Sequence, residues 1–143
     1  MNLSKNIKIT QAITPTAGAA GTTAINGASL DMSGWDGVLM VVTMGAITGS
    51  AVTSINAAQA AVATFADLLG TGQTIADTDD EDIFYIDLYK PTERYVRLEV
   101  ARATQNAVIS SAVYYQYNGS KLPASHGSTI NGEQHTSPAE GTA

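Results

Sequence analysis

The sequence predicts an all-β protein: an antiparallel β-sandwich, jelly-roll-like domain over residues 1–117, followed by an extended C-terminal arm over residues 118–143. Three observations support this prediction. Between Asp82 and Tyr117, three segments have the composition or alternation of strands. The turns between them are short, and short connections favour antiparallel neighbours, so we expect a β-meander. The last 26 residues differ in kind, because they are small, polar, glycine or proline almost throughout.

The strand pattern is clearest in residues 95–102. Val96, Leu98 and Val100 fall on one face, and polar or charged residues alternate with them, as in a half-buried strand. Residues 83–89 before this segment are rich in aromatic and β-branched side chains. The apolar residues of the third segment, 107–117, complete the predicted meander.

Segments upstream of the meander must supply partners for its apolar face. The spacing of Ile7, Ile9 and Ile13 predicts an edge strand near the N-terminus, with Lys8 and Thr10 facing outward. This first strand is of moderate length, which suits an edge position.

A loop with proline and glycine follows at residues 14–21, and residues 22–25 predict a short second strand. The dipeptide Asn26-Gly27 predicts a tight turn, since both residues tolerate positive φ. Residues 38–44 form the most apolar stretch of the chain and show no alternation. We therefore expect a central strand that is buried on both faces.

The alanine-rich residues 56–69 leave two interpretations open. One is a strand followed by irregular chain. The other is a short helix with Asn56 as its N-cap and Gly70 as its stop. Residues 70–82 are polar and acidic, so they predict a surface loop.

Composition limits the partners of this chain. It has 143 residues, no cysteine and a formal net charge of −6. The length predicts one domain with a sizeable core that needs no disulfide. No Lys or Arg occurs from Ile9 to Tyr89, and nucleic-acid binding needs clustered cations, so we expect no nucleic-acid partner.

We also expect no membrane association and a protein that is soluble when made, because the sequence shows neither a signal-peptide pattern nor an apolar run of about 20 residues.

The acidic residues 77–82 invite comparison with a calcium loop. An EF-hand that started at Asp77 would need glycine at its sixth position and an acidic residue at its twelfth. The chain has Asp82 and Leu88 there, so the match fails. A looser divalent-cation site and a solvated acidic loop both remain open.

No pattern in the sequence indicates an enzyme. His126 and His135 lie in the polar C-terminal segment with no cysteine, which is a weak metal signal. The chain has no nucleophile elbow, and Gly18 to Thr22 lacks the lysine and the spacing of a phosphate loop. We therefore expect no catalytic residue, no cofactor and no metal.

Aromatic residues are the stronger candidates for binding. Trp35, beside the expected central strand, predicts core packing, with a role as a binding aromatic as the alternative. All six tyrosines lie on the proposed meander, and tyrosine is enriched at protein interfaces. The alternative is that they cap the sandwich edges and bond to backbone. These tyrosines are Tyr85, Tyr89, Tyr95, Tyr114, Tyr115 and Tyr117.

The C-terminal segment has Leu122 and Ile130 as its only large aliphatic residues. It cannot bury enough apolar surface to offset the entropy of its own ordering. It is therefore predicted to be a disordered tail or an arm that orders on a partner.

Five stretches of the chain carry a resemblance to a known family. They are Leu30-Asp31-Met32-Ser33-Gly34-Trp35-Asp36-Gly37-Val38, Asp67-Leu68-Leu69-Gly70-Thr71-Gly72, Asp87-Leu88-Tyr89-Lys90-Pro91-Thr92-Glu93-Arg94-Tyr95-Val96-Arg97, Lys121-Leu122-Pro123 and Ser137-Pro138-Ala139-Glu140-Gly141-Thr142. With them, the chain resembles small proteins found beside the major capsid gene in tailed bacteriophages and prophages, namely their head decoration or cement proteins. The shared motifs are structural and carry no catalytic signature.

The resemblance implies a virion structural protein on the outer surface of the capsid. Such a protein binds the assembled head and stabilises contacts between major capsid subunits. The implied partners are the major capsid protein and further copies of this chain, with a trimer as the expected homo-oligomer. The residues expected to contact the capsid or a neighbouring copy are Ile7, Ile9, Tyr114, Tyr115, Tyr117, Leu122, Pro123, Ile130 and Pro138.

Other functions remain open at this point. A carbohydrate-binding or adhesion module on the virion would require Trp35 and the tyrosines to form an open platform. Among virion proteins, a tail or head-completion structural protein is a further alternative.

Overall fold

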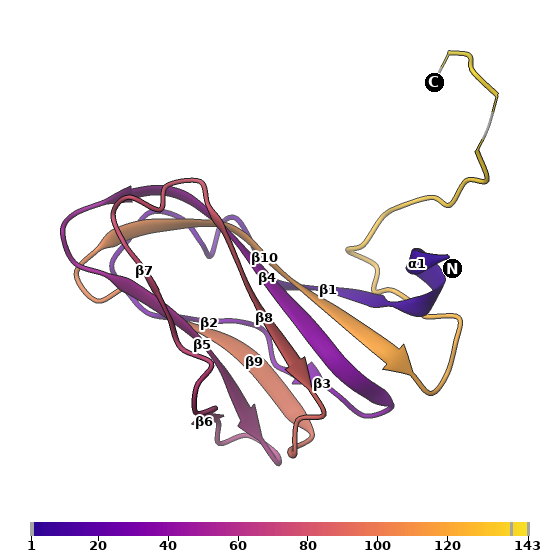
Figure 1. The fold of residues 1–143 in the computed structure, drawn as a ribbon, viewed down its shortest axis with the longest axis horizontal. Coiled ribbons are helices and arrows are strands. Elements are labelled where there is room, and N and C mark those ends of the chain that lie inside the picture. The colour runs from indigo at the N-terminus through magenta and orange to yellow at the C-terminus, as the bar shows by residue number, and fades with distance from the viewer. Residues whose placement is uncertain (1, 138, 143) are drawn as a thin grey trace.

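The structure is a computed structural model that describes residues 2–137 and 139–142. Two antiparallel sheets pack face to face, so the predicted all-β antiparallel sandwich is confirmed (Figure 1). Within the described ranges the one helix is α1 (Leu3–Asn6), a single turn next to the N-terminus. The core lies between the two sheets.

The first sheet has four strands in the order β1-β10-β4-β8. Its edge strands are β1 (Lys8–Ile13) and β8 (Ile83–Tyr89), and its inner strands are the long β10 (Asn106–Gly119) and β4 (Trp35–Thr48). The residues predicted as a central strand, 38–44, therefore do lie in the middle of a sheet.

The second sheet has six strands, several of them very short. At its centre β9 (Tyr95–Ala101) pairs with β5 (Thr53–Ala60). On the far side of β9 lie β2 (Ile25–Asn26) and β3 (Leu30–Asp31), and on the far side of β5 lie β6 (Ala66–Asp67) and β7 (Gln73–Ile75). The prediction of a surface loop over residues 70–82 is therefore wrong for β7, which pairs with β5 and buries Ile75 in the core.

The predicted meander is wrong in its pairing, although all three of its strands form. β8 and β10 lie in the four-stranded sheet, whereas β9 between them lies in the six-stranded sheet. The connections cross the sandwich and contain two residues with positive φ, Lys90 at 51° and Ala103 at 47°. Facing sheets lie about 10 Å apart, which three or four extended residues can span. A short connection is therefore compatible with a change of sheet.

The core is formed by one face of each sheet. On β4 the side chains of Val38, Met40 and Val42 are fully buried, and on β9 those of Val96 and Leu98 are fully buried. The alternation predicted for residues 95–102 is thus confirmed. The expectation that residues 38–44 are buried on both faces is wrong, because Leu39, Val41 and Thr43 point to the outer face and are only half-buried.

The first strand is an edge strand, as predicted, but its orientation differs from the prediction. Ile9 pairs with Tyr115, whose side chain lies on the outer face, and Thr10 pairs with the buried Tyr114. A register shift between Gln11 and Ile13 then turns Ile13 into the core. One extra residue in a strand reverses the faces of all residues beyond it, which a simple spacing of isoleucines does not reveal.

Residues 56–69 contain the end of β5, irregular chain and β6, so the helical interpretation is wrong. The side chains of Ala57, Ala58 and Ala60 are buried in the sheet at 2% exposure or less. Asn56 does not cap a helix; its Nδ2 donates to Asp67 Oδ1 at 3.0 Å, across the β5–β6 pair. Sheet pairing outweighs the helix propensity of alanine here.

Tyr114 connects the two sheets through the core. Its side chain is fully buried, and its hydroxyl accepts a hydrogen bond from the Leu98 N–H at 2.8 Å. Burial raises the pKa of Tyr114 well above its ordinary value. A Cβ atom at Gly27 would lie 2.5 Å from this hydroxyl. Gly27 is therefore needed for the close approach of Tyr114, and not for the tight turn that Asn26-Gly27 predicted.

Arg102 fastens the loop that follows β1 to the end of the sandwich. Its side chain is buried at 4% exposure, and its guanidinium donates to the carbonyls of Thr23, Ala19 and Ala107 at 2.6, 2.7 and 2.9 Å. Burial lowers the pKa of Arg102. The buried cation is thus satisfied by backbone carbonyls from three separate positions of the chain, which holds the loop in place.

We predict that Tyr114→Phe lowers the free energy of unfolding by about 1–3 kcal/mol, because it leaves the Leu98 N–H buried without an acceptor. Urea unfolding of the purified variant measures this loss. Tyr115→Phe is the matched control, since its half-buried hydroxyl has no hydrogen bond to any described residue. Equal stability of the two variants would show that the bond across the core contributes nothing.

Candidate binding surface

The outer face of the four-stranded sheet is aromatic and aliphatic. Cross-strand partners project to the same face of a sheet, so the pairs Val41–Tyr85, Leu39–Tyr115 and Val41–Val113 all belong to this face. We call it the outer apolar face, and define it by Ile9, Leu39, Val41, Ile83, Tyr85, Tyr89, Val113, Tyr115 and Tyr117.

Exposure is greatest along β8. The side chains of Ile83, Tyr85 and Tyr89 are 65%, 63% and 56% exposed, and those on the other strands of this face are half-buried. β8 is an edge strand of its sheet, paired with β4. Exposed apolar side chains gathered on one face are typical of a protein-interaction surface.

The outer face of the six-stranded sheet has a different character. There Arg97 and Glu99 form an ion pair, and Asn56 lies beside Glu99 on the neighbouring strand. The guanidinium of Arg97 also lies over the ring of Phe65, 4.1 Å from its centroid. This face is covered by its own polar and charged groups, so the outer apolar face is the stronger candidate for binding.

Tyr117 lies across the sheet at one end of the outer apolar face. A Cβ atom at Gly37 would clash with the Tyr117 ring, so the missing side chain on β4 lets the ring lie over the strand. The Tyr117 hydroxyl donates to Asp87 Oδ1 on β8 at 2.6 Å. Burial, followed by this hydrogen bond to a carboxylate, raises the pKa of Tyr117 to about 12. β10, β4 and β8 are thus linked by one side chain.

The N-terminal segment extends this face with an apolar hollow of about 300 Å³. Leu3 and Ile7 line it from the N-terminal side, and Leu39, Tyr115 and Tyr117 line it from the sheet. Leu3 is 56% exposed, so the hollow opens to the surface. The predicted contact residues Ile7, Tyr115 and Tyr117 are therefore brought together here.

The chain after β10 folds back on the N-terminal segment. The Ala124 N–H donates to the Lys5 carbonyl at 2.8 Å. The Ile9 N–H donates to His126 Nδ1 at 3.2 Å, and His126 Nε2 lies 3.1 Å from the Ser4 carbonyl. Because Nδ1 accepts a hydrogen bond, Nε2 carries the ring proton and donates it to Ser4. His126 thus holds the beginning of the arm against β1.

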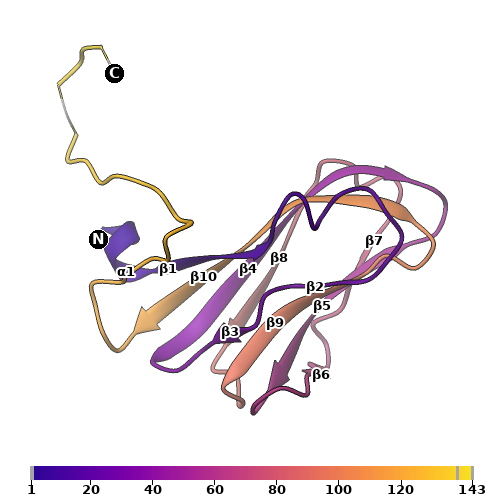
Figure 2. The ribbon, with the colours of Figure 1, turned by 180° about the vertical axis from the view of Figure 1, so that it is seen from behind.

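A groove of about 570 Å³ lies between the edge strand β1 and the arm. Residues 8–11 form one wall, and Ser125, His126, Thr129 and Ile130 contribute to the other. We call it the edge groove. Beyond Ile130 the chain leads away from the sandwich next to α1, as Figures 1 and 2 show from opposite sides.

Among the remaining predicted contact residues, Tyr114 differs from the others because it is fully buried. Tyr114 belongs to the core, so its prediction as a surface contact is wrong; it alternates with Tyr115, and only one of two successive side chains can face outward. Leu122 and Pro123 are exposed at the start of the arm. Ile9 lies on the outer apolar face, Ile130 lines the edge groove, and Pro138 lies outside the described residues.

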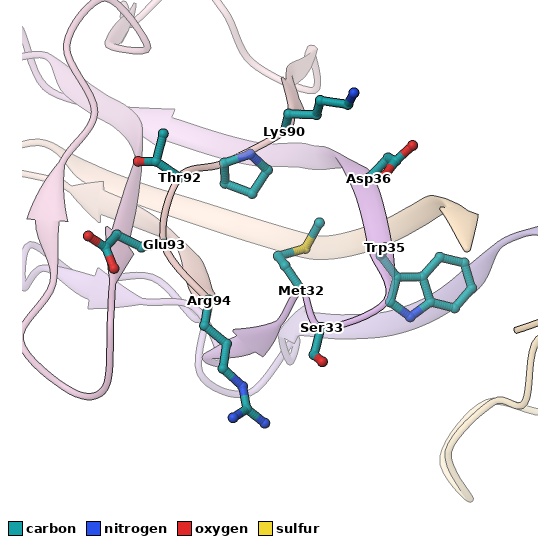
Figure 3. A pocket seen from close by; sticks show the side chains of 9 residues that line it. Met32, Ser33, Trp35, Asp36, Lys90, Thr92, Glu93 and Arg94 are labelled. Carbon is teal, nitrogen blue, oxygen red and sulfur yellow. The ribbon is translucent and has the colours of Figure 1, made fainter. Parts of the chain in front are cut away.

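Trp35 lies at one end of the sandwich, where its half-buried ring packs against the core and over Gly119. It also borders a pocket of about 420 Å³, shown in Figure 3. In this view Lys90, Glu93 and Arg94 point away from one another around Met32. Arg94 is paired with Asp31 at 2.8 Å, which together with the Ser33 N–H lowers the pKa of Asp31. The polar groups do not converge on a common point.

Two of the acidic residues in 77–82 accept hydrogen bonds from the backbone, one within their loop and one from β4. Asp79 Oδ2 accepts the Ala76 N–H at 2.8 Å, and Asp80 Oδ1 accepts the Ile47 N–H at 2.6 Å. Across the described part of the chain, no group of three or more His, Cys, Asp or Glu side chains is placed to hold a metal ion. The carboxylates of Asp79 and Asp80 therefore have a structural role.

Sequence reasoning missed Leu39, Val41 and Val113 as parts of the binding surface. The signal was present in the unbroken apolar run at residues 38–42, which we interpreted as a strand buried on both faces. In the structure the same run supplies the core with one face and the outer apolar face with the other.

Comparison of the chain with protein-family models, with curated proteins and with solved structures finds no match. In residues 2–137 and 139–142, no helix is long and apolar enough to cross a membrane.

We predict that Tyr117→Phe flattens the pH dependence of stability in alkaline solution. The pKa of Tyr117 is raised from 10.0 to about 12 in the folded state, so its stabilising contribution is complete below pH 10 and is lost as the pH rises toward 12. Urea unfolding at a series of pH values measures this slope. Tyr115→Phe, which removes a hydroxyl from the neighbouring part of the same face, is the control, and a slope unchanged in Tyr117→Phe would contradict the assignment.

Proposed function

We propose that this chain is a structural protein of a tailed-bacteriophage virion, a decoration or cement protein that binds the outer surface of the assembled head. The observation that carries the proposal is the outer apolar face, an aromatic sheet surface left open by the described chain. The resemblance of the five sequence stretches to head decoration proteins supports the choice of partner.

The geometry suits a protein that docks on a large, repetitive surface. The face is built on paired strands, so its backbone is fixed before binding and loses little freedom on docking. Tyrosine provides apolar contact area together with a polar tip, which makes it a frequent anchor at interfaces. Tyr85 and Tyr89 are the exposed anchors on this face.

Stabilisation of the shell then follows from mass action. A ligand that binds the assembled head but not its free subunits shifts the equilibrium toward the assembled state. Several copies around a symmetry axis would gain avidity from contacts that are individually weak. We propose that the major capsid protein is the partner and that the decoration unit is a homo-oligomer, with a trimer as the first candidate.

The N-terminal segment and the start of the arm adjoin the outer apolar face, so one docked partner can reach all three. We therefore retain Ile7, Ile9, Tyr115, Tyr117, Leu122, Pro123 and Ile130 as proposed contacts and add Tyr85 and Tyr89. Pro138 stays a contact proposed from the sequence alone. Tyr114 is removed from this set because it is buried.

We predict that Tyr85→Asp weakens binding to purified heads that lack this protein by about tenfold or more, because a charge replaces an anchor in the contact. Tyr85 is 63% exposed, so the substitution leaves the core untouched. Co-sedimentation of the protein with the heads measures the affinity, and cryo-electron microscopy of the pellet locates the bound copies.

The matched control is Leu69→Asp, which introduces the same charge at a fully exposed apolar residue away from the sheet face. It should bind as the wild type does. Wild-type protein that stays in the supernatant would overturn the proposed function, and equal affinity of Tyr85→Asp and wild type would overturn the assigned surface. Density at the neck or tail instead of the head lattice would favour a head-completion or tail protein.

A second candidate is a glycan-binding module on the virion. The exposed tyrosines of β8 favour it, since sugars stack on aromatic rings in open sites. A glycan array probed with the purified protein separates the two candidates: specific hits that Tyr89→Ala abolishes would support the glycan function, and an array without hits would remove it.

A further inference from the structure

The tripeptide Ile-Asn-Gly occurs twice in the chain, at residues 25–27 and at residues 130–132. An asparagine that precedes glycine can react spontaneously, because the backbone nitrogen of the glycine can attack the side-chain amide carbon of the asparagine. Glycine favours this attack, since it has no Cβ to obstruct the approach and its backbone adopts conformations that other residues avoid. The outcome at each copy therefore depends on how firmly the fold holds its backbone.

The first copy is held by the six-stranded sheet. Asn26 lies in β2, opposite Glu99 of β9, and the Gly27 N–H donates to the Leu98 carbonyl at 2.7 Å. The Asn26 side chain is exposed, so water reaches it, but the nitrogen that would attack is committed to a hydrogen bond. Gly27 also packs against the Tyr114 hydroxyl. Reaction at Asn26 therefore requires local opening of the β2–β9 pair.

The second copy has no such restraint. Asn131 and Gly132 are exposed, lie outside every helix and strand, and have no hydrogen bond to another described residue. A Cβ atom at Gly132 would have no described atom within 4 Å. In Figures 1 and 2 this part of the chain leads away from the sandwich. The Gly132 nitrogen can thus approach the Asn131 side chain without any part of the sheets opening.

The chain has one more asparagine before glycine, Asn118-Gly119 at the end of β10. Gly119 pairs with Trp35 of β4, and a Cβ atom there would lie 2.7 Å from the Trp35 ring. This site is therefore held by strand pairing and by packing, as the first copy is. The fold leaves one of the three Asn-Gly sites open to reaction.

We propose that Asn131 is a site of spontaneous deamidation and that the sandwich protects Asn26 and Asn118 from the same reaction. The Gly132 nitrogen forms a bond to Asn131 Cγ and loses its proton, while the Cγ–Nδ2 bond breaks and ammonia leaves. Water then opens the resulting cyclic imide at one of its two carbonyls, which gives aspartate or isoaspartate. The sum is hydrolysis of an amide, so water is the only co-reactant and no oxidation state changes.

The reaction changes the charge of the tail. From Asn131 onward the chain carries Glu133 and Glu140 and has neither Lys nor Arg, so each event adds a third carboxylate. The new charge forms next to Ile130, which lines the edge groove. Isoaspartate also redirects the backbone through the former side chain. This inference concerns the covalent chemistry of the tail and stands apart from the binding of heads.

Peptide mapping by mass spectrometry tests the proposal on the purified full-length protein during incubation in mildly alkaline buffer. We expect the peptide with Asn131 to change from amide to acid at least about tenfold faster than those with Asn26 and Asn118, because only the latter need the sheets to open. Gly132→Ala should slow the reaction at Asn131 by about tenfold, because a Cβ obstructs the attacking nitrogen. In concentrated urea the reaction at Asn26 should reach the rate at Asn131, since the tripeptides are identical.

Folded protein in which Asn26 or Asn118 reacts as fast as Asn131 would overturn the proposal, because the sheets would then give no protection. An Asn131 that stays intact, or a rate that Gly132→Ala leaves unchanged, would do the same. A difference between Asn26 and Asn131 that persists in urea would assign the selectivity to flanking sequence instead of the fold. Asn131→Gln is the matched control: it keeps the amide on a longer side chain, whose ring closure is less favourable, so its peptide should keep its mass.

Discussion

The hydrogen bond between the Leu98 N–H and the Tyr114 hydroxyl is the contact on which the surfaces of this protein depend. It ties β10 to β9 across the core and fixes which side chains of β10 face inward. Because side chains alternate along a strand, burial of Tyr114 directs Tyr115 and Tyr117 outward. A shift of register by one residue would bury Tyr115 and Tyr117 of the outer apolar face and expose Tyr114, which connects the sheets.

Two glycines, neither of them needed for a turn, leave the space that the side chains of Tyr114 and Tyr117 occupy. Gly27 leaves room for the Tyr114 hydroxyl beside β9, and Gly37 leaves room for the Tyr117 ring above β4. Tyr117 can then reach Asp87 on β8, which joins three strands beneath the outer apolar face. The same alternation therefore builds the core on one side of the sheet and an ordered aromatic surface on the other.

The outer faces of the two sheets differ in physical character. The outer apolar face carries exposed aromatic and aliphatic side chains, whereas the outer face of the six-stranded sheet carries the Arg97–Glu99 ion pair. The outer apolar face is therefore the one suited to a folded partner.

The sequence by itself determined that β1, β4, β8, β9 and β10 are strands, which face of β9 enters the core, that residues 38–44 are central, and that the six tyrosines lie on strands, because each rests on local periodicity or composition. Only the tertiary structure decided that β8, β9 and β10 alternate between sheets, that a register shift turns Ile9 outward and Ile13 inward, and that Tyr114 separates from Tyr115 and Tyr117. The reason is physical: a short connection fits both a hairpin and a crossing between sheets, and the choice depends on which distant strands provide pairing and burial.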